Sequence, residues 1–170
     1  MLQRDYLFEW RSVFSNACLG SEIKKELTEE TKEYALSLFE KYGLKDYMKS
    51  RPSALSGGMR QRAALIRTLV PKPDILLLDE PFSALDYQTR LEVCDEISSI
   101  IKNEGKTAIM VTHDISEAIS VSDRVFVLSK IPAFIKSEHI IEIPYNKPRR
   151  DNPLFAEYFN AIWKELKDNG

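Results

Sequence analysis

A short apolar segment that ends in two carboxylates constrains the fold of this chain more than any other feature. Residues 75–78 read Ile-Leu-Leu-Leu, and Asp79 and Glu80 follow them directly. An uninterrupted apolar run is typical of a parallel strand that is buried on both faces. A second run at residues 107–112, TAIMVT, predicts another buried strand, which ends just before His113. Together the two runs predict an α/β fold with a parallel-sheet core.

The polar residues at these strand ends are candidates for chemistry. Open α/β sheets bind their ligands at the carboxyl ends of the strands, and charges next to a buried strand are costly unless something binds them. Asp79 is therefore a candidate ligand of Mg²⁺, and Glu80 a candidate base that orients or deprotonates water. The alternative is that both carboxylates simply reach solvent. A lone histidine at a strand end, such as His113, is more often structural.

A second candidate site lies at the start of a helix that precedes this strand. Ser56 is a suitable N-cap, because its hydroxyl can accept a hydrogen bond from an amide of the first turn. Gly57 and Gly58 leave the neighbouring amides uncovered, and such a helix N-terminus suits a phosphate group. The alternative is an ordinary cap whose glycines allow tight packing. An apolar stripe then continues the helix: Met59, Ala63, Ile66 and Val70.

Composition excludes several classes of protein. The chain has 170 residues, of which 44% are hydrophobic and 29% charged, an ordinary balance for one globular domain. A net charge of −2 gives no sign of a surface for nucleic acid or anionic membranes. Cys18 and Cys94 lack metal-type spacing, which favours a reduced, cytoplasmic setting. No apolar run approaches 18 residues, so any membrane association is expected to come through a partner.

Three segments, in this order, resemble the ATP-binding subunits of ABC transporters. LSGGMRQR at residues 55–62 resembles the family's signature sequence, ILLLDEP at 75–81 its Walker B strand, and SALD at 83–86 its D-loop. The resemblance implies a P-loop NTPase-like core that lacks its N-terminal strands and carries an inserted helical subdomain. The implied activity is ATP hydrolysis that drives a solute through a separate permease, as in nitrate, sulfonate and taurine importers.

The resemblance also assigns roles to individual residues. It implies that Asp79 and Gln3 bind Mg²⁺, that Glu80 acts on the attacking water, and that His113 contacts the terminal phosphate and helps to hold that water. The other residues that the resemblance implies contact ATP are Ser56, Gly57, Gly58, Gln61 and Asp86. Two copies of the subunit would meet head to tail as a homodimer, so that Ser56, Gly57 and Gly58 bind ATP that is held mainly by the other copy.

The N-terminal segment QRDYLFEW resembles the family's Q-loop and the residues after it. Large apolar side chains in a loop indicate either packing or a protein-contact surface. The resemblance implies that this loop lies beside the groove for the coupling helix of a transmembrane permease. Glu9 stands where related importers often have proline. The implied location is cytoplasmic, at the inner face of the membrane, with a solute-binding protein as an indirect partner and no nucleic acid.

The remaining pattern predicts three regions. Residues 11–70 are expected to form the helical subdomain, including a short helix that starts at Val13 and ends at Gly20, and a helix from Thr28 to Tyr42. Residues 71–130 are expected to form the core with the Walker B strand, the D-loop and the switch histidine. Residues 131–170 are expected to form a C-terminal extension. Within these regions we expect a helix capped by Asp86, a second helix that starts with a capping box of Asp114 and Glu117, strands at 125–128 and 140–143, and an exposed basic loop at 146–153. A closing amphipathic helix should bury Phe155, Tyr158, Phe159, Ile162, Trp163 and Leu166 on one face.

A Walker A motif is missing from the sequence. Gly105-Lys106-Thr107 has the GKT triplet, but Ile100 stands where the motif needs glycine, and a strand follows instead of a helix. The phosphate loop is therefore expected upstream of Gln3, and residues 1–170 alone are expected not to hydrolyse ATP. Two alternatives remain open. One is a non-catalytic remnant that occupies a permease, and the other is an ATPase of DNA repair or chromosome maintenance, although those usually carry a long coiled coil before the signature.

Overall fold

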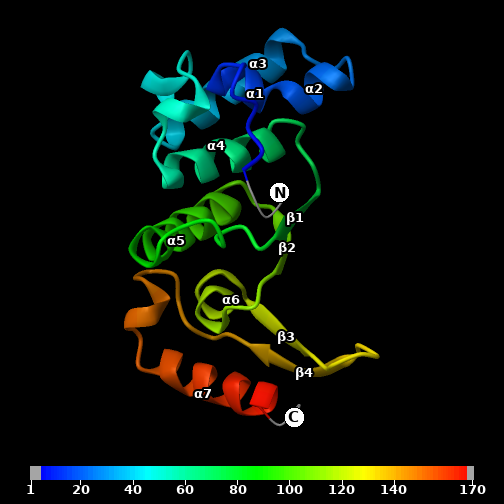
Figure 1. The fold of residues 1–170 in the computed structure, drawn as a ribbon, viewed down its shortest axis with the longest axis vertical. Coiled ribbons are helices and arrows are strands. Elements are labelled where there is room, and N and C mark those ends of the chain that lie inside the picture. The colour runs from blue at the N-terminus through cyan, green and yellow to red at the C-terminus, as the bar shows by residue number, and fades with distance from the viewer. Residues whose placement is uncertain (1–4, 168–170) are drawn as a thin grey trace. The chain divides into compact units, whose positions relative to one another are not determined.

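The structure, a computed structural model, describes residues 5–167 and divides the chain into two compact units (Figure 1). One unit ends at Val111 and the other begins at Thr112. The first unit contains a group of helices and a parallel pair of strands, and the second contains an antiparallel pair with two helices. The mixed α/β character that the sequence predicts is confirmed. None of the helices in residues 5–167 has the length and apolar character that crossing a membrane requires.

The first unit begins with short helices around one long buried helix. Its elements before the sheet are α1 (Val13–Ala17), α2 (Leu19–Ile23), α3 (Glu29–Lys41), the 3₁₀ turns η1 (Lys45–Tyr47) and η2 (Pro52–Ala54), and α4 (Gly57–Leu69). Thr28 caps α3 as expected, and Gly43 follows its end with a φ of +70°. The expected helix end at Gly20 is wrong. Gly20 lies inside α2, where a Cβ atom would come within 3.0 Å of Pro71 Cγ, so the glycine allows a close approach.

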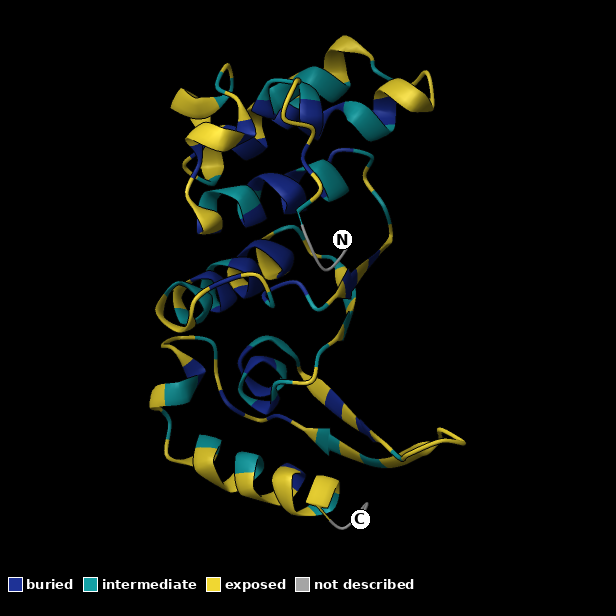
Figure 2. Cartoon of the chain, viewed as in Figure 1, coloured by how far each residue is buried: buried dark blue, intermediate teal, exposed yellow. Residues whose placement is uncertain are grey.

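Helix α4 is the centre of this unit. It contacts α1, α2, α3 and α5, and Figure 2 shows buried residues on several of its sides. The expected stripe along one side is therefore only part of what this helix buries, because neighbours pack around much of its circumference. Its buried residues are Gly58, Gln61, Ala63, Ala64, Leu65, Ile66 and Leu69.

The two apolar runs form a parallel pair joined by a helix. Strand β1 (Ile75–Asp79) pairs with β2 (Thr107–Val111), and α5 (Tyr87–Asn103) connects them. The expectation that β1 is buried on both faces is wrong, because Leu76 and Leu78 are buried while Ile75 and Leu77 are 53% and 63% exposed. A sequence that is apolar at every position cannot show which face of the strand is buried. In this two-stranded sheet only the face that carries Leu76 and Leu78 is buried.

The second unit is built around a small apolar core. Helix α6 (Ile115–Val121) leads into strand β3 (Arg124–Leu128), which pairs antiparallel with β4 (Ile135–Ile140). The turn η3 (Arg149–Asp151) and helix α7 (Leu154–Lys167) complete the unit. The strand expected at 140–143 is displaced, because Ile141 and Ile143 supply core side chains without continuing the β3–β4 ladder. The core residues are Ile115, Ile119, Val125, Val127, Ile141, Ile143 and Ile162.

Two expectations for the end of the chain need correction. Arg149, expected to be exposed, is 3% exposed, and its guanidinium donates hydrogen bonds to the carbonyls of Ile119 at 3.1 Å and Ser122 at 2.6 Å. These carbonyls lie at the end of α6, where helical acceptors lack intrahelical partners, so a buried cation is stabilised there. On α7, Ile162 is buried, but Trp163 and Leu166 stay 47% and 39% exposed, so the apolar face is only partly covered.

Candidate functional site

The N-terminus of α4 has the cap that the sequence predicts. Ser56 Oγ accepts a hydrogen bond from the Met59 amide at 3.3 Å, and the first residues of the helix follow directly. A Cβ atom on Gly57 would lie 2.9 Å from Leu85 Cδ2, and one on Gly58 would lie 2.9 Å from Val93 Cγ2. The glycines thus allow close packing, which is one of the two interpretations. Gly57 and Gly58 also line a pocket, so the two interpretations are compatible.

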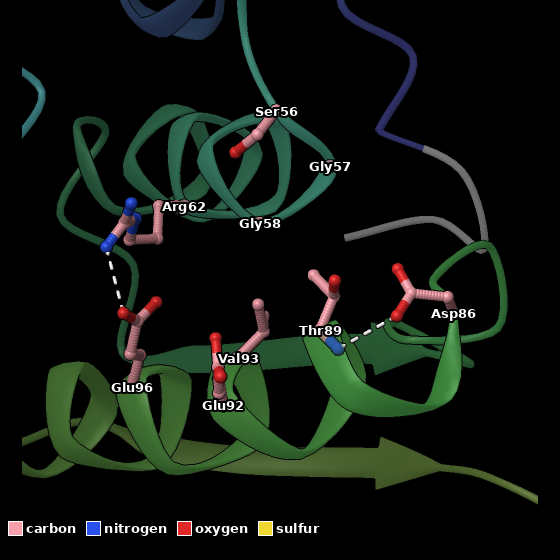
Figure 3. A pocket seen from close by; sticks show the side chains of 9 residues that line it. All are labelled: Ser56, Gly57, Gly58, Arg62, Asp86, Thr89, Glu92, Val93 and Glu96. Carbon is pink, nitrogen blue, oxygen red and sulfur yellow. Dashed lines mark hydrogen bonds and ion pairs between the residues drawn. The ribbon is translucent and has the colours of Figure 1, made fainter.

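This helix end faces the start of α5 across a pocket of about 240 Å³ (Figure 3). The pocket brings together four of the five residues expected to contact ATP: Ser56, Gly57, Gly58 and Asp86. Sequence analysis did not identify the other lining residues, which are Arg62, Thr89, Glu92, Val93 and Glu96. Arg62 and Glu96 form an ion pair with an N–O distance of 3.0 Å, which partly balances the charge of the pocket wall.

The fifth expected contact, Gln61, is not part of this pocket. Gln61 is 2% exposed, and its side-chain Oε1 atom has no hydrogen-bond partner within residues 5–167. A buried amide oxygen without a partner costs free energy. The structure therefore places Gln61 in the interior of the first unit, and its contact with ATP stays a prediction.

Asp86 has a structural role that the sequence predicts. It caps α5 by accepting a hydrogen bond from the Thr89 amide at 3.1 Å. Hydrogen bonds from Thr89 lower the pKa of the Asp86 carboxyl below its usual value. The carboxylate is therefore ionised at neutral pH and lies on the opposite side of the pocket from the glycines.

Asp79 and Glu80 end strand β1 in different backbone conformations. Glu80 has a φ of +41°, in the left-handed region, and its amide donates to the Val111 carbonyl at 2.8 Å. Its own carbonyl accepts from the amide and the hydroxyl of Ser83, at 3.2 and 3.0 Å, which closes a turn. A non-glycine residue in this region carries local strain of about 1 kcal/mol. The turn thus fixes the backbone from which the Glu80 carboxylate projects.

Asp79 is exposed, so the argument that burial makes a bound ion necessary does not apply to it in this structure. Within the described residues, no group of three or more acidic, histidine or cysteine side chains could hold a metal ion. Mg²⁺ is usually bound by one or two carboxylates together with the phosphates of a substrate. A single carboxylate such as Asp79 fits that mode of binding, so its role as a ligand stays a prediction.

Two predicted site residues remain, His113 and Gln3. His113 belongs to the second unit, where it is exposed between Thr112 and the capping residue Asp114. Asp114 accepts from the amides of Ser116 and Glu117 at 2.7 and 3.2 Å, as expected for a cap of α6. Gln3 lies outside the described residues. The joint action of His113 and Glu80 on a water molecule stays a prediction.

The loop at residues 6–10 combines exposed aromatic side chains with a buried leucine. Tyr6, Phe8 and Trp10 are 56%, 36% and 71% exposed, whereas Leu7 is 6% exposed. The rings of Phe8 and Trp10 stack with a centroid distance of 4.6 Å. Packing therefore accounts for the leucine but not for the aromatic residues.

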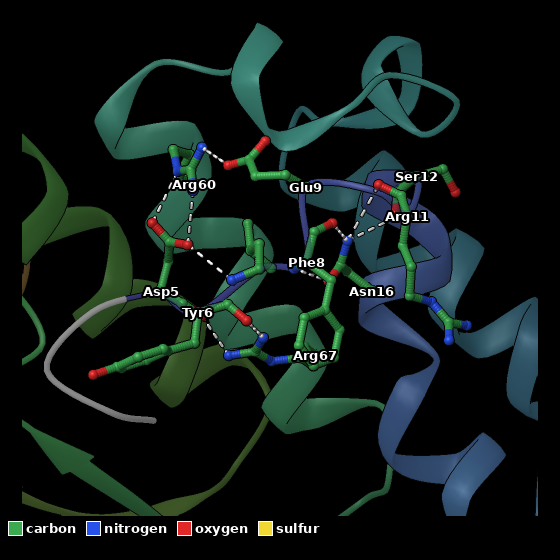
Figure 4. Close-up of polar contacts among 10 residues, drawn as sticks. Asp5, Tyr6, Phe8, Glu9, Arg11, Ser12, Asn16, Arg60 and Arg67 are labelled. Carbon is green, nitrogen blue, oxygen red and sulfur yellow. Dashed lines mark hydrogen bonds and ion pairs between the residues drawn. The ribbon is translucent and has the colours of Figure 1, made fainter.

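Polar contacts that the sequence did not reveal hold this loop (Figure 4). Arg60 on α4 forms ion pairs with Asp5 and Glu9, both at 2.8 Å, and Asn16 on α1 bonds the amide and the carbonyl of Phe8. Burial alone would raise the pKa of Asp5, but hydrogen bonds from Arg60 and Leu7 outweigh it and lower the pKa. The only signal in the sequence is a pair of arginines, Arg60 and Arg67, seven residues apart on an otherwise mostly buried helix.

Comparisons with known proteins show what the chain is similar to. Residues 1–83 match the family model described as ABC transporter. The chain is 49% identical over 172 residues to the uncharacterized ABC transporter ATP-binding protein YtlC of Bacillus subtilis, covering 98% of this chain and 65% of that protein. It is 39% identical over 165 residues to the aliphatic sulfonates import ATP-binding protein SsuB 1 of Rhodococcus jostii, covering 97% and 61%.

A solved structure resembles the fold. The ATP-binding cassette MJ0796, in a dimeric post-hydrolysis state bound to ADP and Pi, matches 82% of this chain and 61% of that chain. The TM-score is 0.62 and the sequence identity is 27%. The chain thus spans between 61% and 65% of the length of these three relatives.

Proposed function

Because this chain belongs to the ABC transporter family of ATP-binding proteins, we propose that it forms part of an ATPase subunit that drives solute import through a separate permease. The observation that carries the proposal is the pocket where the glycine end of α4 faces Asp86. It joins two motifs that are separated in the sequence and includes the glycine turn at the N-terminus of α4. A helix N-terminus suits the phosphate end of a nucleotide, whereas the Asp86 carboxylate, which would repel a phosphate, caps α5.

The size of the pocket supports a shared nucleotide site. At about 240 Å³ it is smaller than the roughly 300–1,000 Å³ of pockets that enclose a whole small molecule. We propose that Ser56, Gly57 and Gly58 contact only the phosphates of an ATP molecule that a second copy of the subunit holds. The copies would then meet head to tail, and each pocket would be completed by its partner.

We assign the catalytic roles to the ends of β1 and β2. Asp79 would hold Mg²⁺, which neutralises charge on the phosphates when it is bound, and Gln3 would assist it. Glu80 would accept a proton from the attacking water, because a positioned carboxylate can act as a general base. The Ser83 turn and the hydrogen bond to Val111 fix the backbone that carries this carboxylate. His113 would contact the terminal phosphate. These groups act by positioning and electrostatics, which dominate phosphoryl transfer.

The exposed aromatic residues at 6–10 support a protein partner. A permease embedded in the membrane fits them, since interfaces are enriched in aromatic side chains, and one relative is named as an import ATP-binding protein. The subunit would lie at the cytoplasmic face of the membrane, and a solute-binding protein would act through the permease.

The test replaces the proposed base. In the subunit as its gene encodes it, assembled with its permease, Glu80→Gln is expected to keep MgATP binding and to lower turnover by at least about a hundredfold, because the amide cannot accept the proton. Glu33→Gln on the exposed side of α3 is the matched control and should leave turnover unchanged. Turnover of Glu80→Gln within a factor of about two of the parent would exclude Glu80 as the base. Absence of turnover in the parent would favour a non-catalytic remnant.

A further inference from the structure

Arg60 joins the aromatic loop to helix α4 through three hydrogen bonds. Its Nε donates to Asp5 Oδ2 at 2.8 Å and its Nη2 to Asp5 Oδ1 at 3.0 Å, while Nη1 donates to Glu9 Oε1 at 2.8 Å. The bidentate pair with Asp5 fixes both the distance and the orientation of the guanidinium. One side chain therefore holds both ends of the segment that carries Tyr6 and Phe8 (Figure 4).

A second arginine reinforces this attachment. Arg67 lies two helical turns after Arg60, on the same side of α4. Its Nη1 donates to the Tyr6 carbonyl at 2.8 Å and its Nη2 to the Asp5 carbonyl at 2.5 Å. These bonds hold the backbone of the loop, whereas Arg60 holds its carboxylates. The loop therefore follows the position of α4.

The other end of this connection is the proposed phosphate site. The Arg60 amide donates to the Ser56 carbonyl at 2.9 Å, within the first turn of α4. At a rise of about 1.5 Å per residue, Arg60 lies only about 6 Å along the helix axis from Ser56. Because Ser56 and Arg60 belong to one hydrogen-bonded turn of α4, a displacement of the helix N-terminus moves Arg60 with it.

The exposed aromatic residues are part of this loop, and α1 also holds them in place. Asn16 Oδ1 accepts from the Phe8 amide at 2.7 Å, and its Nδ2 donates to the Phe8 carbonyl at 3.0 Å. Phe8 stacks on Trp10, whose carbonyl accepts a hydrogen bond from Arg51. The aromatic residues thus form one surface that α1 and α4 hold together, and α4 is the helix whose N-terminus lines the pocket.

We propose that Arg60 is a positioning residue that couples occupation of the pocket at Ser56, Gly57 and Gly58 to the position of the aromatic loop. The inference rests on the proposed function, because it takes ATP as the occupant. When nucleotide fixes the N-terminus of α4, Arg60 fixes Asp5 and Glu9, and the surface formed by Tyr6, Phe8 and Trp10 is held in one arrangement. Linkage is reciprocal, so a partner that binds this surface strengthens nucleotide binding at the pocket.

The Asp5 contact is the stronger half of the connection. The side chains of Arg60 and Asp5 are 25% and 19% exposed, whereas that of Glu9 is 52% exposed. Solvent screens the Glu9 pair more, and exposed ion pairs contribute little. We therefore expect that losing the guanidinium abolishes coupling, and that losing the Glu9 charge only weakens it.

Hydrogen–deuterium exchange tests this in the subunit as its gene encodes it, with and without MgATP. The readout is deuterium uptake in the peptide that covers residues 5–16. In the parent, MgATP should slow this exchange about fivefold or more, the lower range of allosteric coupling. Arg60→Gln should remove the MgATP response, and Glu9→Gln should reduce it. Arg60→Lys should keep part of the response, because lysine retains the charge but cannot form the bidentate pair with Asp5.

Arg51→Gln is the matched control, because Arg51 also bonds the loop but lies outside α4. It should loosen the loop and keep the MgATP response. The coupling through α4 would be overturned if Arg60→Gln kept the full MgATP response. It would also be overturned if Arg51→Gln lost the MgATP response together with Arg60→Gln. A parent that binds MgATP in calorimetry without any change in exchange would overturn the coupling alone. A parent that does not bind MgATP would overturn the proposed function, and the coupling with it.

Discussion

Replacing Gly58 with alanine places a methyl group where two helices meet. A Cβ atom at Gly58 would lie 2.9 Å from Val93 Cγ2 and 3.7 Å from Thr89 Cγ2. Carbon atoms of different residues normally stay about 3.5–4.0 Å apart. Val93 is 3% exposed on α5, and a β-branched side chain in a helix has one strongly preferred rotamer. The backbone of α5 therefore has to move away from α4.

The expected cost follows from two opposing effects. Overpacking of a buried contact costs about 1–3 kcal/mol, and alanine is favoured over glycine inside a helix by about 1 kcal/mol. At the first turn the helical gain is smaller, so we expect Gly58→Ala to lower the free energy of unfolding by about 1–2 kcal/mol. For a chain of this length that is a fall in Tm of roughly 2–8 °C.

A double-mutant cycle with Val93→Ala isolates the contact. Unfolding is measured for the parent, Gly58→Ala, Val93→Ala and the double variant. Removing the Val93 methyl groups makes room, so the double variant should be more stable than the sum of the single changes implies, by about 1 kcal/mol. Strict additivity, or a Gly58→Ala variant more stable than the parent, would refute the packing argument.

Three further predictions concern other parts of the molecule. Burial would raise the pKa of Glu104, but hydrogen bonds from Lys41, Tyr42 and Tyr34 outweigh burial and lower the pKa below 4.5. The stability that this carboxylate contributes is therefore present above pH 4.5 and is lost as the pH falls through the lowered pKa. Glu104→Gln should flatten acid unfolding in that window. Arg149→Met should destabilise the second unit by at least about 2 kcal/mol in chemical denaturation, since hydrogen bonds to charged groups contribute about 1.5–3 kcal/mol each; a change below about 0.5 kcal/mol would contradict its role at the end of α6. A photocrosslinker at position 8 should capture the permease in membranes, and capture of the ATPase alone would contradict the proposed surface.

Local signals in the sequence predicted the helix starts correctly. Ser56, Thr28, Asp86 and Asp114 each cap a helix, because a cap depends on a side chain and an amide only two or three residues away. The order of β1, α5 and β2 was predictable for a similar reason, since each segment carries its own hydrophobic pattern. The motifs at residues 55–62 and 83–86 supply one wall of the pocket each, and the contact of their residues with ATP stays a prediction.

Contacts between distant segments were not predictable. Arg149 looks like part of a basic surface loop, and only the fold shows that it binds carbonyls at the end of α6. Arg60 looks like one charge in a signature sequence, and its partners Asp5 and Glu9 lie more than 50 residues earlier. The exposed face of β1 was mispredicted because Leu77 and Leu78 are chemically identical and differ only in which side of the sheet they occupy.

With Glu80 as the base proposed above, the backbone at this residue would set thermal stability against catalysis. Its left-handed φ of +41° suits glycine or asparagine better than glutamate. A laboratory selection for thermostability alone should therefore recover Glu80→Gly or Glu80→Asn, each relieving strain while removing the carboxylate. Directed evolution of this subunit for use at high temperature would consequently have to hold position 80 fixed and gain its stability elsewhere.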